Sequence, residues 1–145
     1  MRPDELAARE QVRHTIAAYA HAVDRGRFDE AAACFTADGV LDVRGSDRSE
    51  GRDAVAARFA VAGQKLAAAS TKAIVRHHVS SIDIEADVTA GTATSSSYFF
   101  VVTEIGPDHW GTYRDTFRRD DATGRWLISE RQVTVDGRTA PSRMA

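Results

Sequence analysis

Asp24 and His77 are the two ionisable residues whose positions in the sequence best fit chemistry. Asp24 falls in the last turn of a predicted helix, at the flank of its apolar stripe, where the negative end of the helix dipole disfavours a carboxylate. His77 shares a strand face with Val75 and Val79, so its ring is predicted to point inward. An inward histidine can also be a hydrogen-bonded core residue, and an acid on a helix can be a simple surface residue. Position alone therefore leaves a structural role open for both.

A second set of polar residues lies in the last two predicted strands. Tyr113 and Asp115 alternate with Gly111 and Phe117, which look buried, and buried polar groups need partners or a ligand. Arg131 can pair with Asp115 or with an anion of the ligand, and the sequence does not choose between them. The small side chains of residues 94–97 leave room for a ligand midway along a central strand.

Several other kinds of site are not expected. His77 and His78 are neighbours on a strand and point to opposite faces, and no other His or Cys stands at metal-ligand spacing, so we predict no metal site. Cys34 lies among helix alanines, where it is typical of a small core residue. The glycines form neither a phosphate loop nor a dinucleotide fingerprint.

The composition is that of an ordinary globular protein. The chain has 145 residues, 43% of them hydrophobic and 28% charged, and a net charge of −2. A slightly negative net charge creates no electrostatic attraction for nucleic acid, so nucleic-acid binding is not expected. No apolar run approaches the roughly 18 residues that a membrane helix needs. A single cysteine and no signal peptide lead us to predict a cytoplasmic location.

The elements that would position these residues change character midway. Apolar spacings of three and four predict helices over residues 4–24, 28–35 and 52–62, with Asp4 as the first N-cap. Residues 40–43 read as a short strand and residues 44–51 as a loop. Strands are then predicted over residues 73–85, 92–103, 109–119 and 125–136, as an antiparallel meander. Helices followed by strands indicate one α+β domain over residues 1–145.

The first strand of the meander carries an irregularity. Its inward residues are odd-numbered up to Val79 and even-numbered from Ile82, so we predict a β-bulge near Ser80 and Ser81. A bulge bends a sheet, and a bent sheet covered by helices encloses a pocket. Residues 98–102 are apolar on both faces, which favours a homodimer through the sheet.

The order of these motifs resembles a known family. They are Tyr-Ala-His-Ala-Val-Asp (19–24) followed by residues 28–29 and 35–39, Glu-Gly-Arg-Asp-Ala-Val (50–55), Arg-His-His-Val-Ser-Ser (76–81), and Gly-Thr-Tyr-Arg-Asp-Thr-Phe (111–117) running into residues 126–128. Together they span nearly the whole chain. The chain resembles a SnoaL-like member of the nuclear transport factor 2-like superfamily, on the branch with scytalone dehydratase and hexachlorocyclohexane dehydrochlorinase.

The resemblance implies a cystatin-like, cone-shaped α+β barrel, in which a curved, mainly antiparallel (mixed) sheet and N-terminal helices enclose a deep pocket for a small organic molecule. Such proteins are often homodimers. In the dehydratase and dehydrochlorinase relatives, an Asp at the end of the first helix and a His on the strand after the third helix form a catalytic dyad. These positions match Asp24 and His77.

The expected activity is proton abstraction without a metal or organic cofactor. His77 would be the base, Asp24 would stabilise its imidazolium, and Tyr113 would donate a hydrogen bond to the developing oxyanion. We expect Tyr19, Tyr98, Asp115 and Arg131 to bind the substrate. Dehydration, isomerisation or cyclisation of a polyketide-, terpenoid- or aromatic-type substrate would suit this set. A non-catalytic ligand-binding protein and a partner subunit of this fold are the alternatives.

Overall fold

Three helices and one six-stranded sheet make up the described part of the chain, residues 1–69 and 73–143 of a computed structural model. The helices are α1 (Pro3–Asp24), α2 (Phe28–Ala32) and α3 (Arg52–Ala69). The strands are β1 (Phe35–Val43), β2 (Arg48–Glu50), β3 (Val75–Asp87), β4 (Thr92–Thr103), β5 (Gly106–Arg119) and β6 (Trp126–Arg138).

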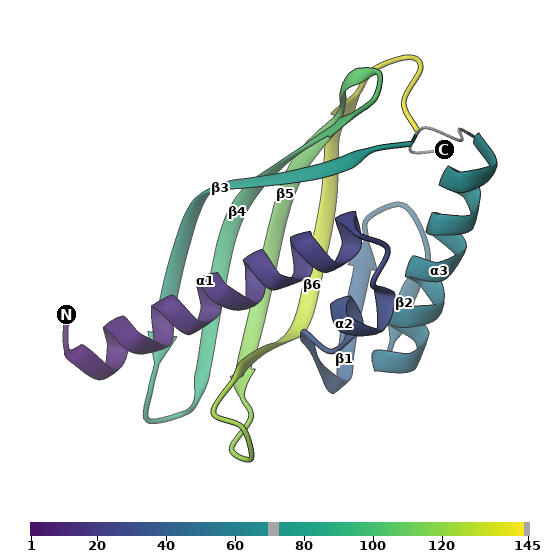
Figure 1. The fold of residues 1–145 in the computed structure, drawn as a ribbon. Coiled ribbons are helices and arrows are strands. Elements are labelled where there is room, and N and C mark those ends of the chain that lie inside the picture. The colour runs from purple at the N-terminus through teal and green to yellow at the C-terminus, as the bar shows by residue number, and fades with distance from the viewer. Residues whose placement is uncertain (70–72, 144–145) are drawn as a thin grey trace.

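The sheet is mixed and curved, with the order β2-β1-β6-β5-β4-β3. β3 to β6 form the predicted antiparallel meander, and β1 pairs with β6 in parallel. Helix α1 crosses one face of the long strands, which we call the inner face, while α2 and α3 lie near β1 and β2 (Figure 1). The α+β prediction is confirmed, and the helices and the inner face of the sheet share one core.

Several predicted boundaries were wrong. The second helix ends at Ala32, and a strand begins at Phe35, because Phe35 pairs with Ile128 of β6. The predicted loop over 44–51 contains β2, and α3 continues to Ala69 through an alanine-rich stretch of high helix propensity. β5 begins at Gly106, three residues before the predicted start. Pairing between distant segments decides the strand boundaries, and local patterns do not contain it, whereas the end of α3 follows local helix propensity.

The start of α1 also differs from the prediction. Arg2 is the N-cap residue and makes no side-chain capping bond, and Pro3 takes the first helical position, which its fixed φ favours. Asp4 therefore lies inside the first turn, where its negative charge still interacts favourably with the positive end of the helix dipole.

The β-bulge in β3 is confirmed. Ser80 pairs with Tyr98 but Asp83 pairs with Ser96, so one extra residue is inserted between them. Ser81 has a φ of 52°, the left-handed value that few non-glycine residues adopt. His77, which precedes the bulge in the chain, faces inward, and Ile84, which follows it, is buried in the core. The bulge thus lets both ends of one strand face α1.

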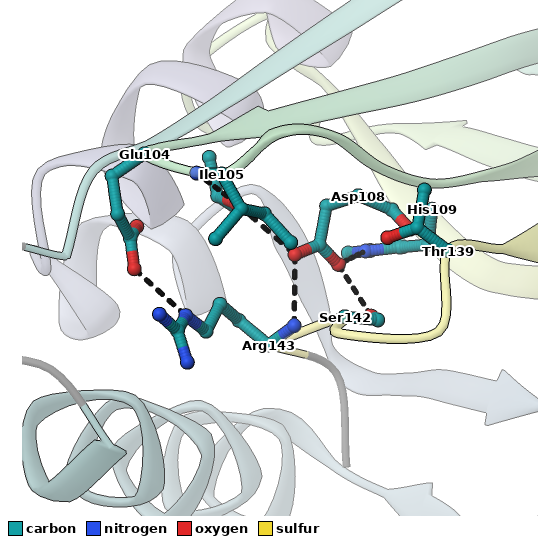
Figure 2. Close-up of polar contacts among 8 residues, drawn as sticks. Glu104, Ile105, Asp108, His109, Thr139, Ser142 and Arg143 are labelled. Carbon is teal, nitrogen blue, oxygen red and sulfur yellow. Dashed lines mark hydrogen bonds and ion pairs between the residues drawn. The ribbon is translucent and has the colours of Figure 1, made fainter.

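The C-terminal tail is held against the β4–β5 turn by Asp108, whose side chain is fully buried (Figure 2). Its carboxylate accepts hydrogen bonds from the Arg143 backbone N–H at 2.8 Å, the Ser142 hydroxyl at 2.5 Å and the Thr103 hydroxyl at 3.1 Å. Burial raises the pKa of Asp108, but these bonds and one from His109 outweigh it and lower the pKa to about 2.

We expect Asp108→Asn to lower the free energy of unfolding by about 2 kcal/mol near neutral pH, the equivalent of the pKa shift from its ordinary value. Because the pKa of Asp108 is lower in the folded than in the unfolded state, its carboxylate stabilises the fold fully at pH values above the unfolded-state pKa. This stabilisation is lost as the pH falls toward the folded-state pKa of about 2. Urea unfolding of both proteins at pH 7 and pH 3 would measure it. An equal difference at the two pH values would contradict the ionic origin.

Candidate functional site

The carboxylate of Asp24 makes two hydrogen bonds to His77. Asp24 Oδ1 lies 2.5 Å from His77 Nδ1, and Asp24 Oδ2 accepts the backbone N–H of His77 at 2.9 Å. Both side chains are largely buried, with 9% of Asp24 and 13% of His77 exposed. The Asp24 carboxylate therefore fixes both the ring orientation and the Nδ1–H tautomer of His77.

The local folding of two segments explains this contact. Helix α1 ends at Asp24, and Gly26 takes a φ of 69° that turns the chain away toward α2. β3 is an edge strand of the sheet, so alternate backbone N–H groups along it have no partner strand. Asp24 satisfies one of these N–H groups and the imidazole of the same residue. Asp24 is unfavourably placed for the helix dipole, but its two hydrogen bonds to His77 stabilise the carboxylate there.

A cleft of about 300 Å³ has Asp24 among its lining residues. It is bounded by the ends of α1 and α3 and the start of β3, and its lining is Val23, Asp24, Gly26, Phe28, Gly63, Leu66, Ala67, Ala73 and Val75. This volume and the mainly apolar lining suit a small organic ligand. A larger hollow of about 460 Å³, lined mostly by exposed polar side chains such as Thr94, Ser96 and Arg114, lies over the outer face of the sheet, away from the dyad.

Arg131 and Asp115 form a fully buried ion pair deeper on the inner face. Arg131 Nε donates to Asp115 Oδ1 at 2.9 Å and Arg131 Nη2 donates to Asp115 Oδ2 at 2.8 Å, a bidentate geometry. Burial lowers the pKa of Arg131, but the charge of Asp115 and its hydrogen bonds outweigh this and raise it. Arg131 therefore stays a cation.

Two tyrosine rings enclose this guanidinium. The Cζ atom of Arg131 lies 4.3 Å from the ring centroid of Tyr19 and 3.9 Å from that of Tyr113. Burial raises the pKa of Tyr19 and of Tyr113, although Arg131 opposes the shift, and the charge of Asp24 adds to it at Tyr113. Both hydroxyls thus stay protonated and remain potential hydrogen-bond donors.

Two buried polar atoms in this region have no hydrogen-bond partner among the described residues. They are Arg131 Nη1 and the hydroxyl oxygen of Ser97, on the neighbouring strand β4. An unpaired donor that is buried costs free energy, which a ligand oxygen or a water molecule would recover. Both atoms are therefore candidate hydrogen-bond donors to an anionic or carbonyl oxygen.

The predicted site residues fall into three groups. Asp24 and His77 are in contact, while Tyr19, Tyr113, Asp115 and Arg131 form the buried cluster. Tyr98 belongs to neither group. Its side chain points to the outer face and is 59% exposed, because it alternates with the inward residues Ser97 and Phe99. We therefore remove Tyr98 from the candidate substrate-binding residues. Asp115 is engaged by Arg131 and so holds that side chain in place.

The sequence prediction did not include Asp108 and His109, which are also in contact. Neighbours on a regular strand point apart, but Val101 pairs with His109 and Val102 with Pro107, so Asp108 is an extra residue in a bulge. His109 Nδ1 consequently lies 2.7 Å from Asp108 Oδ1. The adjacent Asp and His beside Gly106-Pro107 was the only signal in the sequence.

Among the described residues, no group of three or more His, Cys, Asp or Glu side chains could hold a metal ion. None of the helices in that part of the chain is long and apolar enough to cross a membrane.

Comparison with known proteins points to one family. The family model described as SnoaL-like domain matches residues 4–132. A Catenulispora acidiphila protein, solved in complex with S-DNPA, is 27% identical with a TM-score of 0.77 over 90% of this chain and 95% of its own. A Novosphingobium aromaticivorans protein described as NTF2-like with a cystatin-like fold is 25% identical, with a TM-score of 0.77 over 95% of this chain and 88% of its own.

A second protein of Novosphingobium aromaticivorans, provisionally named scytalone dehydratase, has a TM-score of 0.80 at 22% identity, over 96% of this chain and 91% of its own. At that identity the likeness concerns the fold alone. Among curated proteins, none matches the sequence significantly. The predicted cystatin-like, nuclear transport factor 2-like fold is confirmed.

Proposed function

Because the chain belongs to the SnoaL-like domain family, we propose that it is an enzyme that removes a proton from carbon in a small organic molecule without a cofactor. His77 is the base in this proposal, and Asp24 stabilises the imidazolium that forms. The cleft beside Asp24 receives the substrate. Dehydration, isomerisation and cyclisation all begin with such a step.

The hydrogen bond of 2.5 Å between His77 Nδ1 and Asp24 Oδ1 carries this proposal. When Nδ1 carries the proton that is donated to Asp24, Nε2 holds a lone pair that can accept a proton. The carboxylate then faces the positive charge that develops on the ring. A non-catalytic binding protein would not need this pair and is expected to hold Asp24 and His77 apart, so the contact favours an enzyme.

The buried cluster supplies the second requirement of this chemistry, stabilisation of negative charge on oxygen. Tyr19 and Tyr113 stay protonated, and the Nη1 amino group of Arg131 has no partner among the described residues. Donors of this kind, held in a dry site before the reaction, stabilise an oxyanion more than they would in water. In the proposal, the substrate lies with its acidic carbon at His77 and its oxygen toward this cluster.

We also propose that a second copy of the chain covers the outer face of the sheet. Tyr98, Phe100 and Trp110 are 59%, 39% and 37% exposed there. Phe100→Glu should convert a dimer to a monomer in light scattering, because it places a charge within this apolar surface. Leu6→Glu, at an exposed position of α1, is the matched control and should leave the mass unchanged. A monomeric wild type would contradict the dimer.

A generic carbon acid tests the proposed function without knowledge of the natural substrate. Opening of 5-nitro-1,2-benzisoxazole needs only removal of one C–H proton, and the product is a coloured phenolate. The wild-type protein should accelerate this reaction above buffer with saturable kinetics. A rate equal to that in buffer containing free imidazole would contradict the proposal.

A further inference from the structure

A second histidine–aspartate pair lies on the same face of the sheet as Asp24 and His77. His109 lies beside Asp108 (Figure 2), and its Nδ1 is 2.7 Å from Asp108 Oδ1. The side chains of His109 and Asp108 are 15% and 0% exposed. The arrangement repeats that of His77 with Asp24, since in both an imidazole Nδ1 is tied to a largely buried carboxylate. Asp108 also anchors the C-terminal tail, but that role requires only its oxygens and does not require an imidazole.

The strand register places the two imidazoles in one row. Val101 of β4 pairs with His77 of β3 on one side and with His109 of β5 on the other. Val101 is fully buried on the inner face, and residues paired directly across a sheet point to the same face. Two strand spacings, about 10 Å, separate the Cα atoms of the histidines, and Val101 lies between them.

An aromatic platform connects His109 with the buried cluster. The ring of Phe99 meets His109 edge to face at a centroid distance of 6.1 Å and stacks on Tyr113 at 4.5 Å. Gly111 makes room for it, because a Cβ atom there would lie 2.8 Å from Phe99 Cε1. His109 and Tyr113 are therefore linked through the ring of Phe99.

The charged groups around His109 come from three strands. Asp108 is its own neighbour, Arg138 of β6 pairs with it in the ladder, and His77 lies across Val101 on β3. Burial lowers the pKa of His109, Asp108 partly restores it, and the guanidinium of Arg138 lowers it further. Nearby, Glu104 of the β4–β5 turn and Arg143 of the C-terminal tail form an ion pair with each other. The imidazolium of His109 is consequently a stronger acid than that of an exposed histidine.

We propose that His109, held by Asp108, is the acid partner of His77 and protonates an oxygen leaving group of the substrate. This inference rests on the proposed function and narrows it to eliminations, in which a C–H bond and a bond to oxygen break together. A β-hydroxy carbonyl compound that loses water is the substrate class that fits.

The proton balance of the step is as follows. The C–H proton moves to His77 Nε2, and the electron pair left on carbon forms the new π bond. The bond to the leaving oxygen breaks, and that oxygen takes the proton of His109 Nε2, so a hydroxyl leaves as water. His77 then loses a proton to solvent and His109 gains one, which restores the starting state. No oxidant or reductant takes part.

Two benzisoxazoles test this role. Ring opening of 5-nitro-1,2-benzisoxazole forms a weakly basic phenolate, which needs little help from an acid. The phenolate formed from unsubstituted 1,2-benzisoxazole is more basic, so protonation by an acid accelerates its formation more. His109→Gln should lower kcat/KM about tenfold or more for the unsubstituted compound but only about twofold for the nitro compound. The effect on the unsubstituted compound should grow as pH falls from 8 to 5.5, because the acid form of His109 becomes more populated.

Thr139→Ala is the control for a purely structural effect. It removes a hydrogen bond from the C-terminal tail to the backbone carbonyl of Asp108 but leaves the Asp108 carboxylate and His109 in place, so both rates should stay at the wild-type level. Equal losses on the two compounds, with no dependence on pH, would overturn the acid role of His109. If His77→Gln leaves both rates unchanged, the proposed function fails first. If His109→Gln does not fold, the wild-type protein alone tests the acid role of His109. Its kcat/KM for unsubstituted 1,2-benzisoxazole, divided by that for the nitro compound, must then rise as the pH is lowered, and a constant ratio would overturn the role.

Discussion

His77→Gln should reduce the turnover of 5-nitro-1,2-benzisoxazole by a factor between about 10² and 10⁴, the usual contribution of a positioned general base. Glutamine keeps a polar side chain of similar size and can still contact Asp24, so the loss reports the missing base. The measurement is kcat/KM from the absorbance of the phenolate product. His78→Gln is the matched control, because His78 is the neighbouring residue on the exposed outer face.

Asp24→Asn separates the base from its carboxylate. An asparagine that donates its amide N–H to His77 Nδ1 would move the ring proton to Nε2, where the lone pair is needed. We expect a loss of rate comparable with that of His77→Gln, and imidazole ¹⁵N shifts should show the change of tautomer. A rate for either variant within a few-fold of wild type would rule out the dyad.

Asp115→Asn should lower the free energy of unfolding by roughly 3–5 kcal/mol, because it leaves the cation of Arg131 buried without a counter-charge. Both side chains are 0% exposed, so solvent cannot compensate. Urea unfolding at pH 7 is the measurement. An exposed pair provides the control: Arg27 and Glu30 are 57% and 65% exposed, and Glu30→Gln should change the stability by less than about 1 kcal/mol.

The double variant Asp115→Leu with Arg131→Met separates the contribution of this ion pair to stability from its contribution to catalysis. Removal of both charges should recover much of the stability lost in Asp115→Asn, since replacing a buried ion pair by apolar residues is often neutral. The folded double variant should still lose about 10²–10³-fold in benzisoxazole turnover, the usual effect of removing an oxyanion donor. Full activity in this folded variant would show that Arg131 does not take part.

The sequence was sufficient for the fold class and for part of the site. Periods of three to four residues, then of two, indicated helices followed by a meander, and the change of parity between Val79 and Ile82 located the bulge. These are local signals, because the periodicity of one element shows which of its faces is buried. The positions of Asp24 and His77 alone left a structural role open for both, and the resemblance to the SnoaL-like family singled them out as a pair.

Tertiary structure decided which polar residues meet. The 2.5 Å contact joins residues 53 positions apart, and only the docking of α1 on the edge strand β3 brings them together. The choice between a ligand and Asp115 as the partner of Arg131 was settled by the register of β5 with β6, which places them opposite each other. That register depends on pairing energy summed over whole strands, which no single window of sequence contains.

His109 shows the same limit most clearly. Alternation along a regular strand predicts that Asp108 and His109 point apart, and only the bulge opposite Val101 and Val102 turns the carboxylate toward the imidazole. The sequence by itself determined the α+β architecture and the presence of reactive side chains, because composition and period are local properties. The tertiary structure alone decided that Asp24 meets His77, that Tyr98 faces outward and that a second imidazole joins the row, because backbone pairing between distant segments fixes the distance and direction of each side chain.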